Sequence, residues 1–218
     1  MQGKKIAVVL SGCGNQDGAE IHESTLTLLA IHKHGANYQC FAPNIPQHHV
    51  LNHITGQEMD EQRNVLIESA RIARGNIKDL KLFDPAEHDA LIFPGGLGAA
   101  KNLSTYAFDG SDCTINQDVE HAVKAMYKAG KPIGALCIAP VILAKVLARG
   151  ELTVGQDAPT ANNLESMGAH HTQTTHGEIV VDRVNKIVST PCYMLKARVD
   201  QIAEGAEKLV KAVLELTN

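Results

Sequence analysis

The sequence contains no tryptophan, few other aromatic residues and no long hydrophobic run. Aromatic residues make up 4% of its 218 residues, too few for a platform on which bases or sugars stack. No apolar run approaches the roughly 18–20 residues that span a bilayer. Residues 1–14, MQGKKIAVVLSGCG, predict a strand rather than a cleavable signal. We therefore expect neither membrane insertion nor secretion.

Basic clusters and paired cysteines are also absent. Lys and Arg total 20 against 24 acidic residues, which gives a net charge of -4, so the electrostatic footprint of nucleic-acid binding is missing. The five cysteines are widely spread and include no C-x-x-C pair, which argues against a disulfide framework or a zinc ribbon. We expect a cytoplasmic protein with no nucleic-acid and no membrane partner.

Short β-branched runs alternate with longer segments of helical period, as in strands joined by crossover helices. The pattern predicts strands at 4–12, 38–43, 88–96 and 131–137, helices at 21–34, 60–74, 117–129, 138–150 and 196–216, and a β-hairpin over 180–190 that turns near Val184. Residues 1–218 are therefore predicted to form a single α/β domain. Its fold class is a flavodoxin-like, doubly wound, mostly parallel sheet with helices on both faces and a C-terminal β-hairpin addition.

In such sheets the functional site lies beyond the carboxyl ends of the strands. Loop 11–23 joins a strand to a helix, but the dinucleotide fingerprint would need its third glycine where Asp17 stands. No G-x-x-x-x-G-K-[ST] sequence exists either. We therefore predict no nucleotide and no other cofactor.

Loop 93–104, FPGGLGAAKNLS, contains consecutive glycines. They allow the backbone to turn sharply and to present bare N–H groups above the sheet. Such groups suit an oxyanion hole, whereas the alternative is a turn that serves packing alone.

Cys137 stands where a predicted buried strand becomes a helix. This position brings the thiol to the edge of the sheet, near the positive end of a helix dipole and the free N–H groups that begin at Ile138. We expect a lowered thiol pKa and an oxyanion donor beside a nucleophile. A buried structural cysteine is the alternative that the residues alone leave open.

Three segments match a known family in their order, their spacing and their position relative to the predicted strands. They are GAEIHE (18–23), ALIFPGGLGAAKNL (90–103) and AGKPIGALCIAP (129–140). Together they resemble the PfpI-like superfamily, which is related to class I glutamine amidotransferases. The MGAxH (167–171) and IVxTPxYML (187–195) motifs are similar to those of its bacterial ElbB subgroup. The resemblance runs nearly from end to end.

The resemblance implies roles for four residues. The family's nucleophile falls on Cys137 and its buried partner carboxylate on Glu23, while its oxyanion donors fall on the backbone N–H groups of Gly96 and Ile138. Glu23 would be protonated, because burial and a neighbouring negative sulfur raise the pKa of a carboxyl group. It would then donate a hydrogen bond to the thiolate.

The chain departs from the family pattern at a third position. Family enzymes often carry a histidine shortly after the strand that follows the nucleophile's helix, but residues 152–159, LTVGQDAP, hold none. His171, which matches the subgroup motif, is a possible third member, and His22 and His170 are further candidates. A surface or packing role is the more common one for such a histidine.

The resemblance also implies a homodimer and a small-molecule aldehyde substrate. The expected function is a cysteine-dependent, glutathione-independent glyoxalase that converts glyoxal or methylglyoxal to the hydroxy acid, an activity that could equally reflect protein deglycation. One alternative is a redox-sensing or chaperone-like protein with an oxidisable Cys137. Another is an amidohydrolase that uses the H-x-E triplet of His176 and Glu178.

Histidines gather in two places without forming a metal motif. Neither group combines an ordered ligand spacing with carboxylates or thiols, so no metal site is predicted. The two groups are His48, His49 and His53, and His170, His171 and His176.

Overall fold

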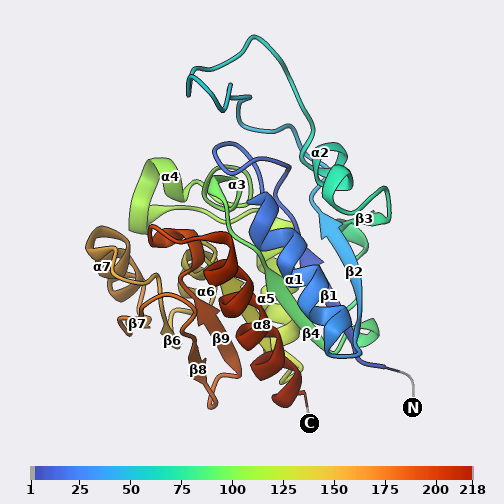
Figure 1. The fold of residues 1–218 in the computed structure, drawn as a ribbon, viewed down its shortest axis with the longest axis vertical. Helices are drawn as coiled ribbons and strands as arrows, with labels where there is room; N and C mark the ends of the chain where they lie inside the picture. The colour runs from blue at the N-terminus through green and yellow to red at the C-terminus, as the bar shows by residue number, and fades with distance from the viewer. Residues whose placement is uncertain (1–2, 218) are drawn as a thin grey trace.

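The computed structural model describes residues 3–217, in which a seven-stranded sheet is covered by helices on both faces (Figure 1). From one edge to the other, its strands are β3 (Ile77–Asp79), β2 (Asn37–Ala42), β1 (Lys5–Val9), β4 (Ala90–Phe93), β5 (Ile133–Leu136), β9 (Ile187–Thr190) and β8 (Val180–Asp182). Neighbouring strands are parallel except β8 and β9. The predicted flavodoxin-like, doubly wound sheet with a C-terminal hairpin is therefore confirmed.

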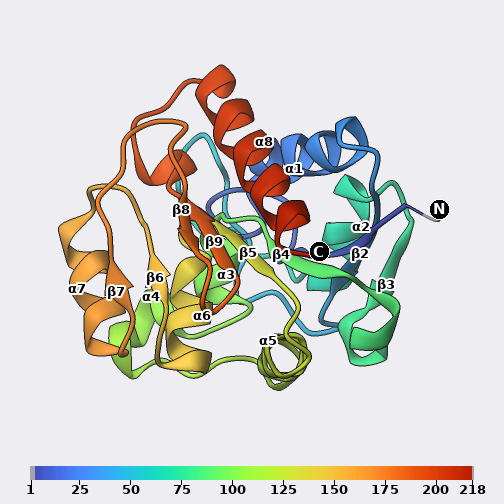
Figure 2. The same cartoon turned by 90° about the horizontal axis from the view of Figure 1, so that it is seen from below.

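Helices cover the two faces of this sheet. Helices α1 (Ile21–Lys33) and α8 (Val199–Glu215) pack against each other on one face, and α5 (Gln117–Lys128) and α6 (Pro140–Leu147) cover the other (Figure 2). The shorter helices are α2 (Val65–Ile72), α3 (Leu97–Lys101), α4 (Tyr106–Asp109) and α7 (Ala158–Ser166), with 3₁₀ turns at Leu80–Leu82, Pro85–Glu87, Gly110–Asp112 and Cys192–Met194. Strands β6 (Glu151–Leu152) and β7 (His170–His171) form a separate parallel pair. Within residues 3–217, none of the helices has the length and apolarity to cross a membrane.

The centre of the sheet is the core of the molecule. Every residue of β4 and β5 is buried, as expected for parallel strands that are covered on both faces. Gly134 allows α8 to approach β5 closely, because a Cβ at this position would lie 2.9 Å from Leu209 Cδ2.

Helices α2, α6 and α7 differ from the sequence prediction for local reasons. Helix α2 begins at residue 65 instead of 60, because the Asn64 side chain accepts a hydrogen bond from Ile67 N and caps the helix. Helix α6 begins at Pro140 instead of 138, because residues 137–139 form a tight turn. Helix α7 was not predicted, since it buries only Thr160 and Leu164 and shows little apolar periodicity.

Residues 43–64 leave the body of the molecule as a surface excursion (Figure 1). It is held together by isolated β-bridges between Pro46 and Asn64 and between Leu51 and Glu58. Its tip is fully open to solvent, with Ile54 96% exposed. The segment just before Ile54 contacts the loop after β1, where Leu51 N donates to Asp17 Oδ2 at 2.7 Å.

Packing between α8 and the sheet should account for a measurable part of the stability. We expect Leu209→Ala, at a fully buried position of α8, to lower the free energy of unfolding by about 2–5 kcal/mol. Leu29→Ala is the matched control, because Leu29 also lies in a helix but is 53% exposed, and its effect should stay within about 0.5 kcal/mol. Urea denaturation measures both, and equal losses would contradict this account of the core.

Candidate active site

The loops that follow β1, β4, β5 and β9 meet beyond the carboxyl ends of these strands. The loop after β1 and the loop after β4 are joined by backbone hydrogen bonds from Glu20 N to Gly95 O at 2.9 Å and from Gly98 N to Gly18 O at 2.9 Å. Beside them, Cys137 N donates to Thr190 O at 2.9 Å and connects the ends of β5 and β9. Four separate stretches of sequence therefore form one rigid surface.

Cys137 occupies a sharp turn between β5 and α6. Its φ angle is 59°, a left-handed conformation that costs a non-glycine residue of order 1–3 kcal/mol and that persists only where the surroundings hold it. The residue is 7% exposed, and the backbone N–H groups of Gly96 and Ile138 donate hydrogen bonds to its sulfur. The elbow therefore presents a sulfur that is already surrounded by two amide donors.

Glu23 reaches the same sulfur from the first turn of α1. Its side chain is fully buried and shares a hydrogen bond with Cys137. Gly95 N donates to its Oε2 at 2.9 Å, and Tyr193 N donates to its Oε1 at 3.2 Å. Burial first and the negative charge of Glu20 second raise the pKa of Glu23 to about 8, so its carboxyl group holds a proton at neutral pH.

The electrostatics of Cys137 differ from the sequence expectation. Burial first and the Glu23 carboxylate second raise the pKa of the thiol, whereas the helix dipole predicted a lowered value. The two amide donors favour the thiolate but do not outweigh burial. Because the two groups are buried and in contact, they titrate as a pair. The hydrogen bond between them lowers the pKa of Glu23 and raises the pKa of Cys137, so the sulfur keeps the shared proton when the carboxylate forms.

The glycines after β4 make this contact possible. A Cβ at Gly95 would lie 2.4 Å from Cys137 Cβ and 2.6 Å from Glu23 Oε2. Gly96 has a φ of 92°, and a Cβ there would lie 2.3 Å from Glu20 N. The Gly-Gly pair therefore serves both purposes considered from the sequence, since it packs the two loops together and directs an N–H group at the sulfur.

A cavity of about 390 Å³ opens beside Cys137. Its walls are mostly apolar or uncharged, with two carboxylates among them. The lining residues are Asn15, Glu20, Gly96, Leu97, Ala100, Tyr106, Ala107, Cys137, Ile138, Asp157, Thr160, Tyr193 and Met194. The predicted Cys137, Gly96 and Ile138 all line this space, and Glu23 lies directly behind the sulfur.

The structure does not bring His171 to this cavity, which corrects its prediction as a possible third member. His171 lies in β7, where its backbone N donates to Glu165 Oε1 at 2.7 Å, and it is absent from the lining. His170 is exposed and faces the same Glu165. These two histidines are held by the short β6–β7 pair, which is not part of the main sheet.

His22 is the candidate histidine that connects to the cavity. Its Nδ1 lies 2.8 Å from the hydroxyl oxygen of Tyr193, and Tyr193 lines the cavity. Tyr193 belongs to the 187–195 motif and, through its backbone N, also holds Glu23. The sequence contained this motif, but only the fold shows that it closes one side of the site.

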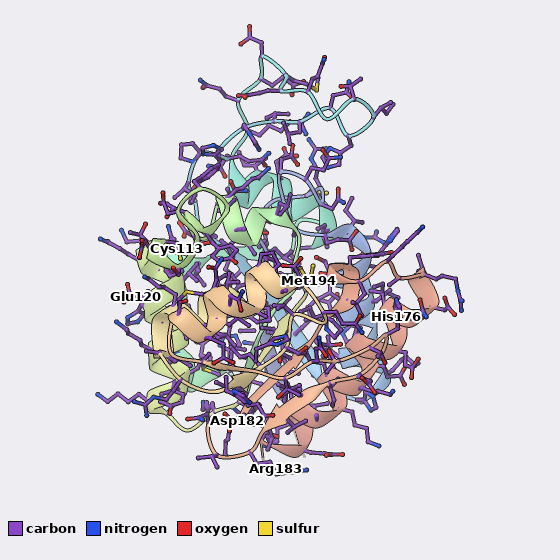
Figure 3. All side chains as sticks on the ribbon, turned by 90° about the vertical axis from the view of Figure 1, so that its left-hand side faces the viewer. Cys113, Glu120, His176, Asp182, Arg183 and Met194 are labelled. Carbon is purple, nitrogen blue, oxygen red and sulfur yellow. The ribbon has the colours of Figure 1, made fainter. Side chains whose placement is uncertain are left out.

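The H-x-E triplet of the amidohydrolase alternative lies elsewhere. His176 Nε2 contacts Lys196 O at 3.1 Å, and the exposed Glu178 accepts from Thr175 N. Neither residue lines the cavity, and Figure 3 shows His176 nearer the edge of the molecule than Met194, which does line it. Among the described residues, no group of three or more histidine, cysteine or acidic side chains is arranged to hold a metal ion.

Asp157 is a site residue that the sequence reasoning missed. It falls in the 152–159 segment, where the family's histidine is absent, and its Oδ2 caps α7 by accepting from Thr160 N at 3.0 Å. Because α7 itself was not predicted, nothing in the sequence pattern pointed this side chain toward Cys137. An Asp-x-Pro capping pattern at 157–159 would have been the available signal.

Comparison with known proteins places these features in context. The model of the DJ-1/PfpI family matches residues 76–190. The human glutamine amidotransferase-like class 1 domain-containing protein 3, mitochondrial, is 50% identical over 98% of this chain and 83% of its own length. The crystal structure of an isoprenoid biosynthesis protein with an amidotransferase-like domain from Ehrlichia chaffeensis matches with a TM-score of 0.90 and 36% identity, over 97% of this chain and 99% of that one. A glyoxalase III from Candida albicans shares the fold, with a TM-score of 0.60 and 16% identity over 98% of this chain and 97% of that one.

These relatives correct the predicted cytoplasmic location. Relatives from human, rat and zebrafish, at 50%, 48% and 39% identity, are all named as mitochondrial proteins. They point to a mitochondrial rather than a cytoplasmic location. The prediction was wrong because cysteine usage separates reducing from oxidising surroundings and does not tell one reducing compartment from another.

The buried carboxyl group of Glu23 should make stability depend on pH. Its pKa of about 8 lies above the ordinary value of 4.5, so between these values the folded state binds more protons than the unfolded state and stability falls as pH rises. We expect Glu23→Gln to remove this fall, a difference of a few kcal/mol between pH 5 and 8. Urea denaturation at several pH values measures it, with the exposed Glu58→Gln as control. Identical slopes in the parent and Glu23→Gln would contradict the assignment.

Proposed function

The chain belongs to the DJ-1/PfpI family, and on this premise we propose that it is a cysteine-dependent, glutathione-independent glyoxalase that converts glyoxal or methylglyoxal to the hydroxy acid. The observation that carries the proposal is the contact of the Cys137 sulfur with Glu23 and with two amide donors at the wall of a cavity. The fold adds to this support, because a protein of the same fold is named glyoxalase III.

The first step is the addition of Cys137 to the aldehyde. The ionised form of Glu23 takes the proton of the thiol, the sulfur forms a bond to the carbonyl carbon, and the π electrons of the carbonyl move to its oxygen. The N–H groups of Gly96 and Ile138, which bind the sulfur at rest, are the donors available to this oxyanion. Glu23, whose pKa is about 8, gives its proton to the oxygen and leaves a hemithioacetal.

The second step moves hydrogen within the bound substrate. Glu23, now a carboxylate, takes the proton from the carbon that carries sulfur and returns it to the neighbouring carbon, while the hydroxyl proton of the first carbon moves to the carbonyl oxygen of the second. The first carbon is thereby oxidised and the second reduced, so no external oxidant is needed. The product is a thioester of Cys137, which water hydrolyses to glycolate or lactate and the free thiol.

We assign the proton transfer of the hydrolysis step to Tyr193 and His22. Burial raises the pKa of Tyr193, with Glu20 and Glu23 adding to the effect, so its hydroxyl stays protonated and acts as a relay. The 2.8 Å contact with His22 supports this role, because the exposed imidazole of His22 connects the hydroxyl to the surface. The pair takes the place of the family histidine that this chain lacks.

A homodimer remains a prediction from the family resemblance.

Removal of the thiol should abolish the reaction. We expect Cys137→Ala to form glycolate from glyoxal, and lactate from methylglyoxal, only at the uncatalysed rate, because no covalent intermediate can form. Cys13→Ala is the control, since Cys13 is half-buried and does not line the cavity. The product acids are measured without added glutathione. Undiminished turnover by Cys137→Ala would exclude this nucleophile.

Loss of the relay should slow turnover more than it weakens binding. We expect Tyr193→Phe, which removes only the hydroxyl, to lower kcat by about 100-fold with little change in KM, and His22→Gln to act in the same direction. His32→Gln is the control on the same helix, because His32 stacks on Tyr38 away from the cavity. The measurement is the dependence of kcat on pH. If Tyr193→Phe and the parent protein show the same dependence, the proposed relay is wrong.

A further inference from the structure

The cavity beside Cys137 contains acidic side chains but no basic ones. Among the described residues, Glu20 and Asp157 line it, together with apolar and uncharged polar groups, whereas no lysine, arginine or histidine does. Neither carboxylate takes part in a salt bridge within the described part of the chain. A substrate in this space therefore meets negative charge without a protein countercharge.

Glu20 is the more deeply placed of the two carboxylates. The residue is 8% exposed, and its Oε2 caps α1 by accepting from Glu23 N at 2.7 Å. Its Oε1 has no hydrogen-bond partner among the described residues, although the side chain lines the cavity. Burying a carboxylate without a countercharge is costly, so a cation bound beside Glu20 would relieve this cost.

Asp157 adds a second carboxylate from a distant part of the fold. It stands at the start of α7, and one of its oxygens is used by Thr160 N. Figures 1 and 2 both show α7 well apart from α1, which carries Glu20 at its start. The two acids thus belong to separate elements that meet only at the cavity, and they do not form an acidic run on one helix.

The size of the cavity points the same way. Its volume of about 390 Å³ lies in the range of pockets for whole ligands, roughly 300–1,000 Å³. A two- or three-carbon dicarbonyl leaves much of this space empty. A substrate with a longer substituent on its carbonyl would extend past Cys137 along the walls that hold the carboxylates.

We propose that the preferred substrate is an α-oxo aldehyde whose substituent carries an ammonium group, with Glu20 and Asp157 as the residues that select it. This inference rests on the proposed function, because Cys137 performs the same addition and internal hydrogen transfer. The ammonium group lies beside the two carboxylates while the aldehyde carbon faces the sulfur. An α-oxo aldehyde that carries a carboxylate is repelled by the same groups.

Charge-selective labelling of Cys137 tests the inference without requiring turnover. Three methanethiosulfonates are compared: the cationic trimethylammonioethyl, the neutral methyl and the anionic sulfonatoethyl reagent. In each case the thiolate attacks the sulfenyl sulfur, a mixed disulfide forms and methanesulfinate leaves. Rates at Cys137, measured by peptide mass spectrometry, are divided by those for N-acetylcysteine. We expect the normalised rate for the cationic reagent to be about ten times the normalised rate for the anionic reagent.

Isosteric variants connect this ratio to the two carboxylates. Glu20→Gln and Asp157→Asn keep the oxygens that cap α1 and α7 but remove the charges, so each should lower the ratio. The control Glu58→Gln, in the surface excursion, should keep it. A normalised ratio of one in the parent protein overturns the inference, and so does a Cys137 that none of the three reagents modifies, since the cavity would then be closed to ligands.

Turnover separates this inference from the proposed function. The specificity ratio is kcat/KM for an aminoalkyl-substituted glyoxal divided by kcat/KM for methylglyoxal, and we expect it to be above one and to fall in Glu20→Gln and in Asp157→Asn. If methylglyoxal is turned over with no preference for the ammonium group, the glyoxalase stands and the charge selection fails. If no aldehyde reacts while the labelling ratio stays high, the glyoxalase fails and the cavity still selects cations.

Discussion

The proton shared between Glu23 and Cys137 is the interaction on which the rest of the site depends. Both side chains are buried, and burial raises the pKa of each. The hydrogen bond between them keeps the proton on the sulfur when Glu23 ionises, and the N–H groups of Gly95 and Tyr193 hold the carboxylate. Gly95 must lack a side chain to leave room for this contact. The elbow at Cys137 and the start of α1 therefore have to be positioned together.

Much of the fold and part of the site could be predicted from the sequence. The alternating β-branched and helical segments indicated the parallel sheet, and the strand-to-helix junction at Cys137 indicated the elbow. The direction of the thiol pKa was missed because a helix dipole can be inferred from local sequence, whereas complete burial depends on how β5, α1 and the 94–98 loop pack. The same limit applies to Asp157, whose direction depends on a short helix with little apolar periodicity.

The positions of the candidate histidines depend on the fold rather than on the sequence motifs. His171 matched a motif but lies in a separate pair of short strands, while His22, adjacent in sequence to Glu23, reaches the cavity through Tyr193. The hydroxyl and the imidazole come from opposite ends of the chain and meet because α1 and the segment after β9 adjoin the same strand ends. Sequence neighbours of a buried residue can therefore face solvent and still communicate with it.

The surface excursion at 43–64 provides a place where the chain can accept an insertion. The side chain of Ile54 is exposed, whereas Leu51, three residues earlier, is bound through Asp17 to the loop that supplies Asn15 to the cavity. Chain ends or inserted modules are best tolerated at such exposed tips. A fluorescent reporter inserted at this point would leave the packed sheet untouched and would stand beside a loop that also borders the cavity.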